Sequence, residues 1–427
     1  MRRHARCNGR RTEVPALRTI LRSVNLLDGE RAIRSNVSVV VEGGLIAAVG
    51  DGAALASRPG DAVYSLPGKT VMPGMVSGHF HATFEGATLD VFPLGVDQPP
   101  GVLMLRAAKN ARLALECGFT SVVGAGGGDD IDAQLVLGIA QGLAAGPRIV
   151  PCSRNLGTTS GYIDLAPWWY EMRNLGACRL GDGPDAFRAI VREEIRRGAR
   201  MIKVFVTGGH GNLNTGVREL SRAELAAIVD AAHERGARVR AHCAWKPRIL
   251  ECVEIGVDAI DHGDEIDAEC IDAMARAGTF WDPSPLYLHK LLELPALQGP
   301  EHAALRDVTA RELENLARWL PEAQRAGVRI VLGDDYGTAF LPHGRYADEI
   351  AFFVKQLGCA PLDVLGWATK NGGAFMGVPE LGTLAPGRLA DLLVVDGDPS
   401  ADPTLLCDRA RIRGVMQNGV WFRAPTA

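Results

Sequence analysis

The sequence predicts an α/β fold: a (β/α)8 TIM barrel with a small β-sandwich domain assembled from both chain termini. Apolar, strand-like runs alternate with helical patterns through the middle of the chain, and β-rich runs with glycine turns recur at both ends. Residues of metal-ligand type follow several of the apolar runs. Strands that alternate with helices pair in parallel through right-handed crossovers, and eight of them favour a barrel over an open sheet.

The two ends of the chain share a hairpin pattern. Residues 37–41 and 45–49 flank Gly43-Gly44, and Asn418-Gly419 marks a tight turn near the C-terminus. We therefore expect one composite β-sandwich domain and, inserted into it, one barrel domain. The N-terminal segment of the chain is basic and lacks the apolar segment of a signal peptide. We therefore expect a disordered tail or a start codon placed too early. The expected bounds are 1–16 for the tail, 17–72 plus 383–424 for the sandwich and 73–382 for the barrel.

The expected barrel strands are short apolar runs with helical patterns between most of them. One such helical pattern covers residues 184–195, and another begins at Ser221, which has Glu224 at capping-box spacing. The expected strands cover residues 71–78, 119–124, 148–152, 201–206, 237–243, 257–261, 279–282 and 328–333.

Composition excludes several classes of protein. The 427 residues are 47% hydrophobic and 22% charged, as in a globular protein with a sizeable core. A net charge of −4 gives no electrostatic case for nucleic acid, and no stretch reaches the ~18 apolar residues of a membrane span. Nine scattered cysteines without CxxC spacing argue against a disulfide framework or a thiolate zinc site, and indicate reduced thiols. We expect a cytoplasmic homo-oligomer that binds a small-molecule substrate, no nucleic acid and no membrane.

Candidate metal ligands lie where the expected strands end. His79 and His81 are two residues apart at the end of the first strand, so their imidazoles share a face and can bind one ion. An isolated pair of this kind is usually two surface histidines. Four further residues lie on or after other strands, however, and barrel enzymes carry their chemistry at the C-terminal strand ends. These residues are Lys203, His242, His262 and Asp335.

Four imidazoles and one carboxylate suit zinc or a similar divalent ion and leave a coordination position for water. Lys203 does not fit a simple ligand set, because an ammonium group is repelled by cations. Burial and nearby positive charge favour its neutral amine, which can capture carbon dioxide to form a carbamate that bridges two metals. A lysine paired with Asp335 or another acid fits the spacing equally well.

Six segments resemble motifs of the amidohydrolase superfamily, and specifically its imidazolonepropionase-like and Xaa-Pro dipeptidase-like branch. The resemblance covers nearly the whole chain. Residues 73–81 resemble the opening P-G-[LM]-[IV]-[DN]-x-H-x-H, and residues 381–392 resemble the returning L-G-[ST]-[IL]-x-P-G-[KR]-x-A-D. The other matching segments are 118–122, 200–204 (with Lys203 at the carboxylated-lysine position), 241–243 and 260–263.

The resemblance implies a metal-dependent amidohydrolase with two divalent ions, for which we expect Zn²⁺, and N6-carboxylation of Lys203 by carbon dioxide. The implied ligands are His79, His81, Lys203, His242, His262 and Asp335. A metal-bridging hydroxide would attack the carbonyl of an amide-type C–N bond, and Asp335 would pass the proton to the leaving nitrogen.

Two positions depart from the motifs of the family. The eighth strand ends Gly333-Asp334-Asp335 where relatives have G-T-D, so a second carboxylate stands beside the catalytic one. Tyr162 stands where relatives carry a histidine that polarises the substrate. A phenol can still donate one hydrogen bond, and we expect Tyr162 or His210 to hold the developing oxyanion. Xaa-Pro dipeptides are therefore not the substrates we expect to be best.

The expected substrate is an N-acyl amino acid, a peptide-like molecule or an aromatic amide. Aromatic residues gather after the strand ends although aromatic content is only 6%, which favours an apolar or aromatic substrate. Packing of a lid or a subunit interface would explain the same rings. The candidate substrate contacts are Tyr162, Trp168, Trp169, Trp245 and His343.

Other functions fit parts of the pattern. A cyclic amidase or deaminase can use the same barrel, but mononuclear deaminases generally lack the bridging lysine. Ester, lactone or carbamate hydrolysis would use the same site. A non-catalytic binding or scaffold protein fits poorly, because all six ligand positions are filled.

Overall fold

The computed structural model describes residues 18–30, 33–51, 55–87, 97–164, 169, 176–213 and 216–426. The expected tail, residues 1–16, lies outside this part of the chain, as does Trp168.

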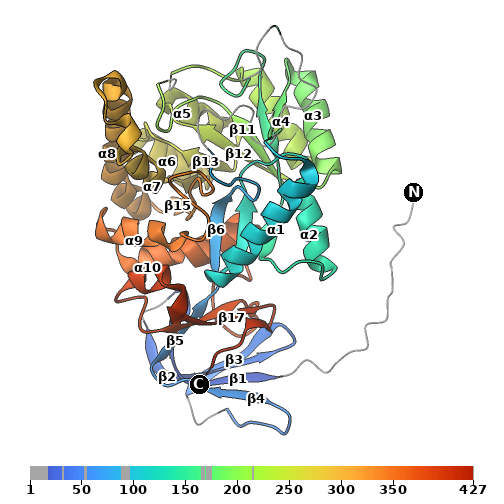
Figure 1. Cartoon of the computed structure of the whole chain (residues 1–427), viewed down its shortest axis with the longest axis vertical. Helices are drawn as coiled ribbons and strands as arrows, with labels where there is room; N and C mark the ends of the chain where they lie inside the picture. The colour runs from blue at the N-terminus through green and yellow to red at the C-terminus, as the bar shows by residue number, and fades with distance from the viewer. Residues whose placement is uncertain are drawn as a thin grey trace, which may run out of the picture.

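Strands from both ends of the chain form one sheet of eight strands (Figure 1). The order is β18-β17-β16-β5-β1-β2-β3, with β4 paired to β1. The junction of the two ends is the antiparallel pair β5–β16, and the hairpins expected at Gly43-Gly44 and Asn418-Gly419 are the pairs β2–β3 and β17–β18. Two-layer sandwich packing and the domain bounds stay predictions. The strands are β1 (Thr19–Leu26), β2 (Arg34–Glu42), β3 (Leu45–Asp51), β4 (Ala62–Ser65), β5 (Lys69–Pro73), β16 (Leu392–Asp396), β17 (Ile412–Gln417) and β18 (Val420–Arg423).

The middle of the chain forms two parallel sheets. One has the order β10-β9-β11-β12-β13-β14-β15 and the other the order β6-β7-β8. The backbone N–H of Gly78 in β6 donates to Leu332 O, 2.5 Å away and just after β15, so the first and last strands touch. Closure of an eight-stranded barrel stays a prediction. The strands are β6 (Met75–Phe80), β7 (Phe119–Gly124), β8 (Arg148–Val150), β9 (Cys152–Gly157), β10 (Cys178–Leu180), β11 (Met201–Phe205), β12 (Arg238–Cys243), β13 (Ala259–His262), β14 (Phe280–Asp282) and β15 (Arg329–Ile330).

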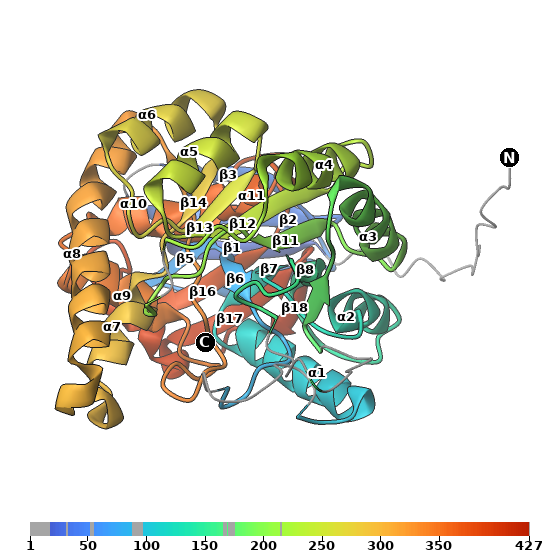
Figure 2. The ribbon, with the colours of Figure 1, turned by 90° about the horizontal axis from the view of Figure 1, so that it is seen from above.

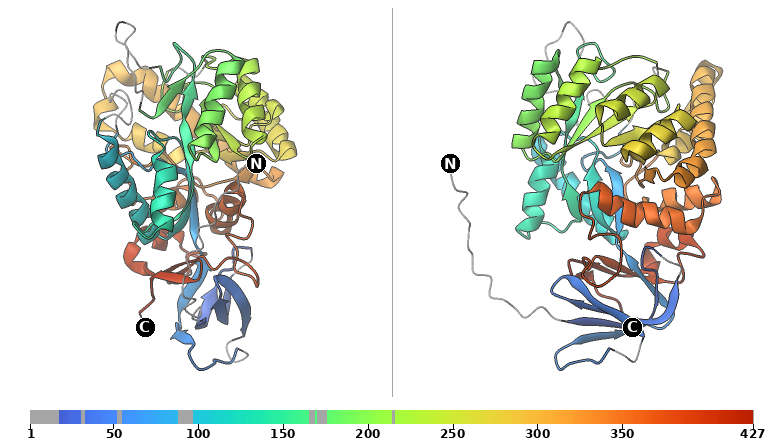
Figure 3. Two further views of the ribbon diagram at one scale, coloured as in Figure 1. Left: turned by 90° about the vertical axis from the view of Figure 1, so that its right-hand side faces the viewer. Right: turned by 180° about the vertical axis from the view of Figure 1, so that it is seen from behind.

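The terminal sheet and the parallel strands lie at opposite ends of the molecule (Figure 3). Helices lie outside the parallel strands, as Figure 2 shows from above. They are α1 (Pro100–Glu116), α2 (Ile131–Ala140), α3 (Pro184–Arg196), α4 (Arg222–His233), α5 (Lys246–Ile255), α6 (Ala268–Ala277), α7 (Pro285–Leu292), α8 (Ala303–Ala326), α9 (Ala347–Lys355), α10 (Pro361–Gly366) and α11 (Gly372–Phe375). Short 3₁₀ helices cover Pro295–Leu297, Pro300–His302, Pro403–Cys407 and Arg409–Arg411, and a π-helical turn covers Trp367–Asn371.

Helix α4 shows the local rules that start these helices. Its N-cap is Ser221, whose side chain accepts the N–H of Glu224, while the Glu224 carboxylate accepts the N–H of Ser221. Two of the backbone N–H groups that a helix start leaves unpaired are satisfied in this way. The capping box expected from the sequence is therefore present.

Two of the expected strands are divided in the structure. The first divides at Gly74, so that β5 belongs to the terminal sheet and β6 to the three-stranded parallel sheet. A Cβ on residue 74 would collide with the side chain of Thr120, so only glycine lets the chain pass there. The third divides at Pro151, which has no N–H to donate, so β8 pairs with β7 while β9 pairs with β11.

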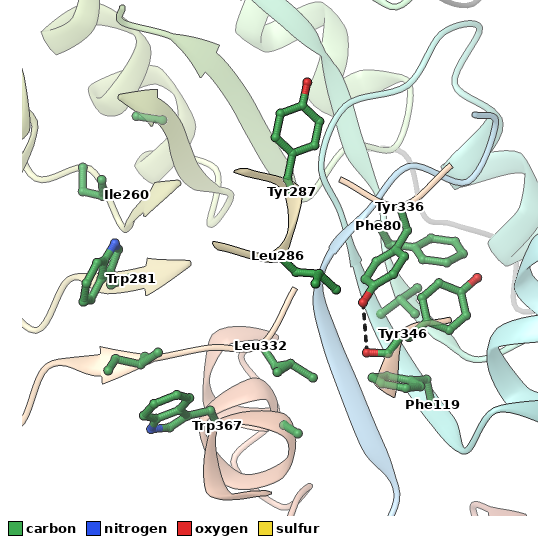
Figure 4. Close-up of a cluster of buried hydrophobic side chains, with 14 of the residues drawn as sticks. Phe80, Phe119, Ile260, Trp281, Leu286, Tyr287, Leu332, Tyr336, Tyr346 and Trp367 are labelled. Carbon is green, nitrogen blue, oxygen red and sulfur yellow. Dashed lines mark hydrogen bonds between the residues drawn. The ribbon is translucent and has the colours of Figure 1, made fainter. Parts of the chain in front are cut away.

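An aromatic cluster packs against the face of β6 that carries Phe80 (Figure 4). Phe119 and Tyr346 lie with ring centroids 5.4 Å apart, and the Tyr336 hydroxyl donates to Tyr346 O at 3.2 Å. Because side chains alternate along a strand, fixing Phe80 on this face sends the neighbouring residues 79 and 81 to the other. The packing of Phe80 in the core thus directs the side chains of His79 and His81 to the opposite face.

No helix in the described ranges is long and apolar enough to cross a membrane. The eight cysteines within them are all free, and six of these are buried.

Candidate metal centre and substrate pocket

His79 and His81 face one carboxylate at the end of β6. Their Nε2 atoms lie 3.0 and 3.2 Å from Oδ1 of Asp335, and their ring centroids are 5.0 Å apart. The Nδ1 atom of His81 lies 3.1 Å from Gly126 O. A carbonyl oxygen can only accept, so Nδ1 of His81 carries the hydrogen and Nε2 offers its lone pair toward Asp335. The imidazoles of His79 and His81 therefore lie on one face, as their spacing in the sequence predicted.

His210, His242 and His262 form a second group of rings beside the first. The ring centroid of His262 lies 3.8 Å from that of His210, 4.5 Å from that of His242 and 5.7 Å from that of His79. Each of the three rings of this second group has one buried nitrogen with no hydrogen-bond partner in the described part of the chain. These nitrogens are Nε2 of His210, Nε2 of His242 and Nδ1 of His262. Buried polar atoms are rarely left without a partner, and an imidazole nitrogen without one is free to bind a cation.

Burial sets the protonation of the ligand residues. It lowers the pKa of His242 and His262 far below the usual value, with nearby Lys203 and His210 adding to the effect. Burial would raise the pKa of Asp335, but the adjacent His79 and His81 hold it well below its usual range. His242 and His262 are therefore neutral beside an ionised Asp335, and these are the protonation states that bind metal. Burial would lower the pKa of His79 as well, but Asp335 and Asp282 raise it above its usual value.

Three groups of side chains have ligand atoms within 4.8 Å of one another. One is His79, His81 and Asp335, and a second is His210, His262 and Asp335. The third, His79 with Asp261 and Asp282, surrounds the guanidinium of Arg240, which already supplies a cation there. The residues thus fit a divalent ion at the first two groups, which share Asp335.

Lys203 lies in an ion pair. Its Nζ is 2.5 Å from Oδ2 of Asp261, with both side chains buried. Burial would raise the pKa of Asp261, but Arg240 and Lys203 hold it below its usual range. Of the two interpretations that the spacing left open, this geometry is that of a lysine paired with an acid. Carboxylation of Lys203 stays a prediction.

Arg240 in β12 lies below the ligands and is completely buried. It donates to Asp261 Oδ1 at 2.7 Å and to Asp282 Oδ2 at 2.9 Å. Its Nη1 also donates to the carbonyls of Gly78 and Gly124, at 2.6 and 3.2 Å. One guanidinium thus connects β13 and β14 of the larger parallel sheet with β6 and β7 of the smaller one.

A pocket of about 350 Å³ opens over the ligand residues. Aromatic side chains make up much of its wall: Phe84, Tyr162, Phe205, Tyr287 and Phe340. His79, His81, Lys203, His242, His262 and Asp335 all line it, so the structure brings the six predicted ligands to one cavity. Its volume is that of a small-molecule site.

Tyr162 and His210, the predicted oxyanion donors, also line this pocket. The Tyr162 Oη accepts a hydrogen bond from Asn212 Nδ2 at 3.2 Å, which leaves the phenol hydrogen to donate elsewhere. Burial, Asp335 and Glu219 raise the pKa of Tyr162, so the phenol keeps that hydrogen. The Nδ1 of His210 lies 2.9 Å from Asp264 Oδ1. Burial would lower the pKa of His210, but the carboxylate of Asp264 outweighs this effect and raises the pKa to about 9.

Three of the other predicted substrate residues, Trp169, Trp245 and His343, are not among the residues that line the pocket. The side chain of Trp169 is exposed, and Trp245 forms the N-cap of α5. His343 lies behind the ligands, with Nε2 3.2 Å from His81 O and Nδ1 2.8 Å from the Tyr346 hydroxyl. Trp168 lies outside the described residues. In this geometry His343 supports the backbone of His81, and its contact with substrate stays a prediction.

Several residues of the site were missed by the sequence analysis. Asp264, Asp282 and Arg240 contact histidines of the site, and Gly126 orients His81 through its carbonyl. Asp282 is the last residue of β14, so the strand-end rule that identified the ligands could also have identified it.

The chain is similar to several known hydrolases along most of its length. Ochratoxinase from Aspergillus niger is 26% identical over 432 residues, which cover 95% of this chain and 87% of that protein. A prolidase crystallised with N-methylphosphonate-L-proline is 30% identical with a TM-score of 0.83, covering 95% of this chain and 99% of that one. A Xaa-Pro dipeptidase with bound methionine is 25% identical with a TM-score of 0.84, covering 95% and 100%.

The sequence model of the amidohydrolase family matches residues 70–422, a span that includes every predicted ligand. The resemblance on which the sequence analysis relied is therefore confirmed, and the fold neighbours have the TIM-barrel type of fold. The chain belongs to the amidohydrolase family and is a hydrolase that acts on carbon–nitrogen bonds.

Proposed function

We propose that the protein is a metal-dependent hydrolase of amide-type C–N bonds in small molecules with an aromatic or apolar group beside the bond. The observation that carries this proposal is the pocket of about 350 Å³, whose lining combines the metal-ligand residues with aromatic rings, among them Phe84 stacked on His81 and Phe205 stacked on His242. A divalent ion at the ligand residues would polarise the scissile carbonyl and lower the pKa of water to about 7.

Proton transfer is assigned to Asp335. Its carboxylate is the one shared by both ligand groups, and it lines the pocket in which the leaving nitrogen has to lie. It is ionised, because the histidines around it hold its pKa low, so it can accept a proton from water and pass it to the leaving nitrogen. Tyr162 donates its free phenol hydrogen to the developing oxyanion.

The basic residues that lie on or after parallel strands favour a neutral substrate. Arg154 is ion-paired with Glu194, Lys246 with Asp267 and Arg248 with Glu251, so none of these three is free to hold a substrate carboxylate. Lys203, which does line the pocket, is paired with Asp261. Aromatic amides are therefore favoured over N-acyl amino acids and dipeptides.

Two ions, with Zn²⁺ as the expected metal, and a carbamate on Lys203 complete the proposal. Carboxylation requires Lys203 to leave Asp261, which would then keep Arg240 as its partner. Mass spectrometry of the intact protein under carbon dioxide, with Lys203→Ala as the control, measures the modification.

A substrate panel tests the reaction. The zinc-loaded full-length protein is incubated with neutral anilides, N-acyl amino acids, Xaa-Pro dipeptides, cyclic amides and aryl esters, and with a nitrogen heterocycle as a deamination control. We expect the highest kcat/KM for neutral anilides and a low value for Xaa-Pro dipeptides. Ammonia release from the heterocycle with every amide intact would make the protein a deaminase instead.

A further inference from the structure

His210 occupies an unusual backbone position. Its φ is +59°, in the left-handed region that only a few per cent of residues other than glycine adopt. Its side chain is almost completely buried between the rings of His262 and Tyr287, at centroid distances of 3.8 and 5.2 Å. Such strain persists where the surroundings enforce it, and it is concentrated at functional sites.

Acidic side chains from two other elements hold this residue in place. Asp264, two residues beyond β13, faces Nδ1 of His210 at 2.9 Å, and its own backbone carbonyl accepts from Asn315 of α8 at 2.8 Å. Glu312, also of α8, accepts the N–H of Gly211 at 2.8 Å. The position and the orientation of the His210 ring are therefore fixed by contacts on the side away from the pocket.

The other ring nitrogen of His210, Nε2, is buried and has no hydrogen-bond partner in the described part of the chain. One nitrogen of this ring lies within 4.8 Å of ligand atoms of His262 and Asp335. Because Nδ1 is occupied by Asp264, Nε2 is the nitrogen that is left to bind an ion. Metal-bound histidines typically donate their second N–H to a carboxylate, which fixes the ring and makes the ligand more basic. The Asp264–His210 pair has this arrangement.

We propose that His210 is a metal ligand, held by Asp264 as its positioning residue, and that it binds the second ion together with His262 and Asp335. The inference rests on the proposed function, since it needs a metal centre. It goes beyond the six ligands that the sequence motifs imply and replaces the role of oxyanion donor for His210. Like any histidine ligand, His210 gives up a proton when the ion binds.

This site also makes the second ion less dependent on Lys203. In the structure Nζ of Lys203 is held by Asp261, whereas His210, His262 and Asp335 already converge. An ion can therefore bind these three residues before a carbamate forms. Carboxylation of Lys203 would then add a bridging ligand to an ion that is already present.

Metal affinity, measured without substrate, tests the inference. Full-length wild type, His210→Ala and Asp264→Asn are depleted of metal, and Zn²⁺ binding is followed by competition with a chromophoric chelator. Binding of Co²⁺ is followed by its d–d spectrum. We expect His210→Ala to weaken one of two binding steps at least ~100-fold, and Asp264→Asn to weaken the same step ~10–100-fold, the usual effect of removing such a carboxylate.

The matched control is His233→Asn. His233 also pairs with a carboxylate, Asp258 at 2.8 Å, but on the exposed end of α4, so this variant keeps wild-type affinity at both steps. If His210→Ala binds both ions with wild-type affinity and an unchanged Co²⁺ spectrum, the inference is overturned, and a fall in kcat alone would return His210 to the oxyanion. If wild type itself binds no ion, the proposed function fails.

Discussion

Two adjacent carboxylates at the end of the eighth strand have different surroundings. Asp334 is completely buried, and its oxygens accept the N–H of Asp335 at 2.8 Å and of Tyr287 at 3.2 Å. Asp335 instead faces His79 and His81. Asp334, which stands at the threonine position of the G-T-D motif, thus binds backbone N–H groups, while Asp335 lines the pocket.

We therefore expect Asp335→Asn to lower kcat at least ~10²-fold, because the amide cannot accept the proton. Asp334→Asn is the matched control: it replaces one of the two side-chain oxygens that accept backbone N–H groups with an NH₂ donor, so it lowers the free energy of unfolding by about 1–3 kcal/mol while the folded fraction keeps most of its turnover. Steady-state kinetics and urea denaturation of both variants measure these effects. The reverse pattern would show that Asp334 is the catalytic residue.

Asp132 in α2 gives a prediction for pH. Burial raises its pKa from 3.8 to about 6, although its Oδ2 accepts the N–H of Cys152. The folded protein then binds the proton more tightly than the unfolded chain, so this group lowers stability as the pH rises from about 4 to about 6. Two pKa units correspond to about 3 kcal/mol.

Asp132→Asn removes this titration. We expect urea denaturation of the metal-depleted protein to give equal stabilities for wild type and variant near pH 4. At pH 7 the variant should be more stable by up to about 3 kcal/mol. A difference between the two proteins that does not change between pH 4 and pH 7 would exclude a raised pKa.

At the scale of elements, the junction between β5 and β6 decides how the terminal sheet meets the parallel strands. Gly74 lies between them, against Thr120 of β7. We expect Gly74→Ala to lower the free energy of unfolding by about 1–3 kcal/mol, because a methyl group there forces the backbone or Thr120 to move. Urea denaturation measures it. The control, Gly101→Ala in α1, meets no atom within 4 Å and should be neutral or slightly stabilising; equal losses in both variants would contradict the account.

The elements show what the sequence could predict. Apolar runs and helical periodicity predicted the order of strands and helices, because burial and alternation are local properties. The divisions at Gly74 and Pro151 depend on which neighbour each half pairs with, and pairing is not a local property. The same limit applies to the site: the ligands follow strands, whereas the partner of Lys203 was found only through the pairing of β11, β12 and β13.

At the scale of the whole molecule, Arg240 ties the two parallel sheets together below the ligands. Arg240→Met would leave Asp282 buried without its cation and Asp261 with Lys203 alone, and breaking a buried ion pair costs about 3–5 kcal/mol. We expect that loss of stability together with weaker metal binding, because Asp282 also contacts Nδ1 of His79 at 3.2 Å.

Arg240→Lys is the matched variant, since it keeps the charge but loses the forked geometry of the guanidinium. It should fall between wild type and Arg240→Met in both urea denaturation and chelator competition. Unchanged stability in Arg240→Met would show that the two sheets do not depend on this residue.

We propose that the convergent histidines and Asp335 hold the divalent ions at which an amide is hydrolysed. The most direct measurement is the rate of anilide hydrolysis by metal-depleted protein during titration with Zn²⁺, with bound metal counted by atomic emission in the same samples. We predict no hydrolysis without metal and a rate that rises with bound zinc up to two ions per chain, with His81→Asn inactive throughout. Full hydrolysis by protein that retains no metal would contradict the account.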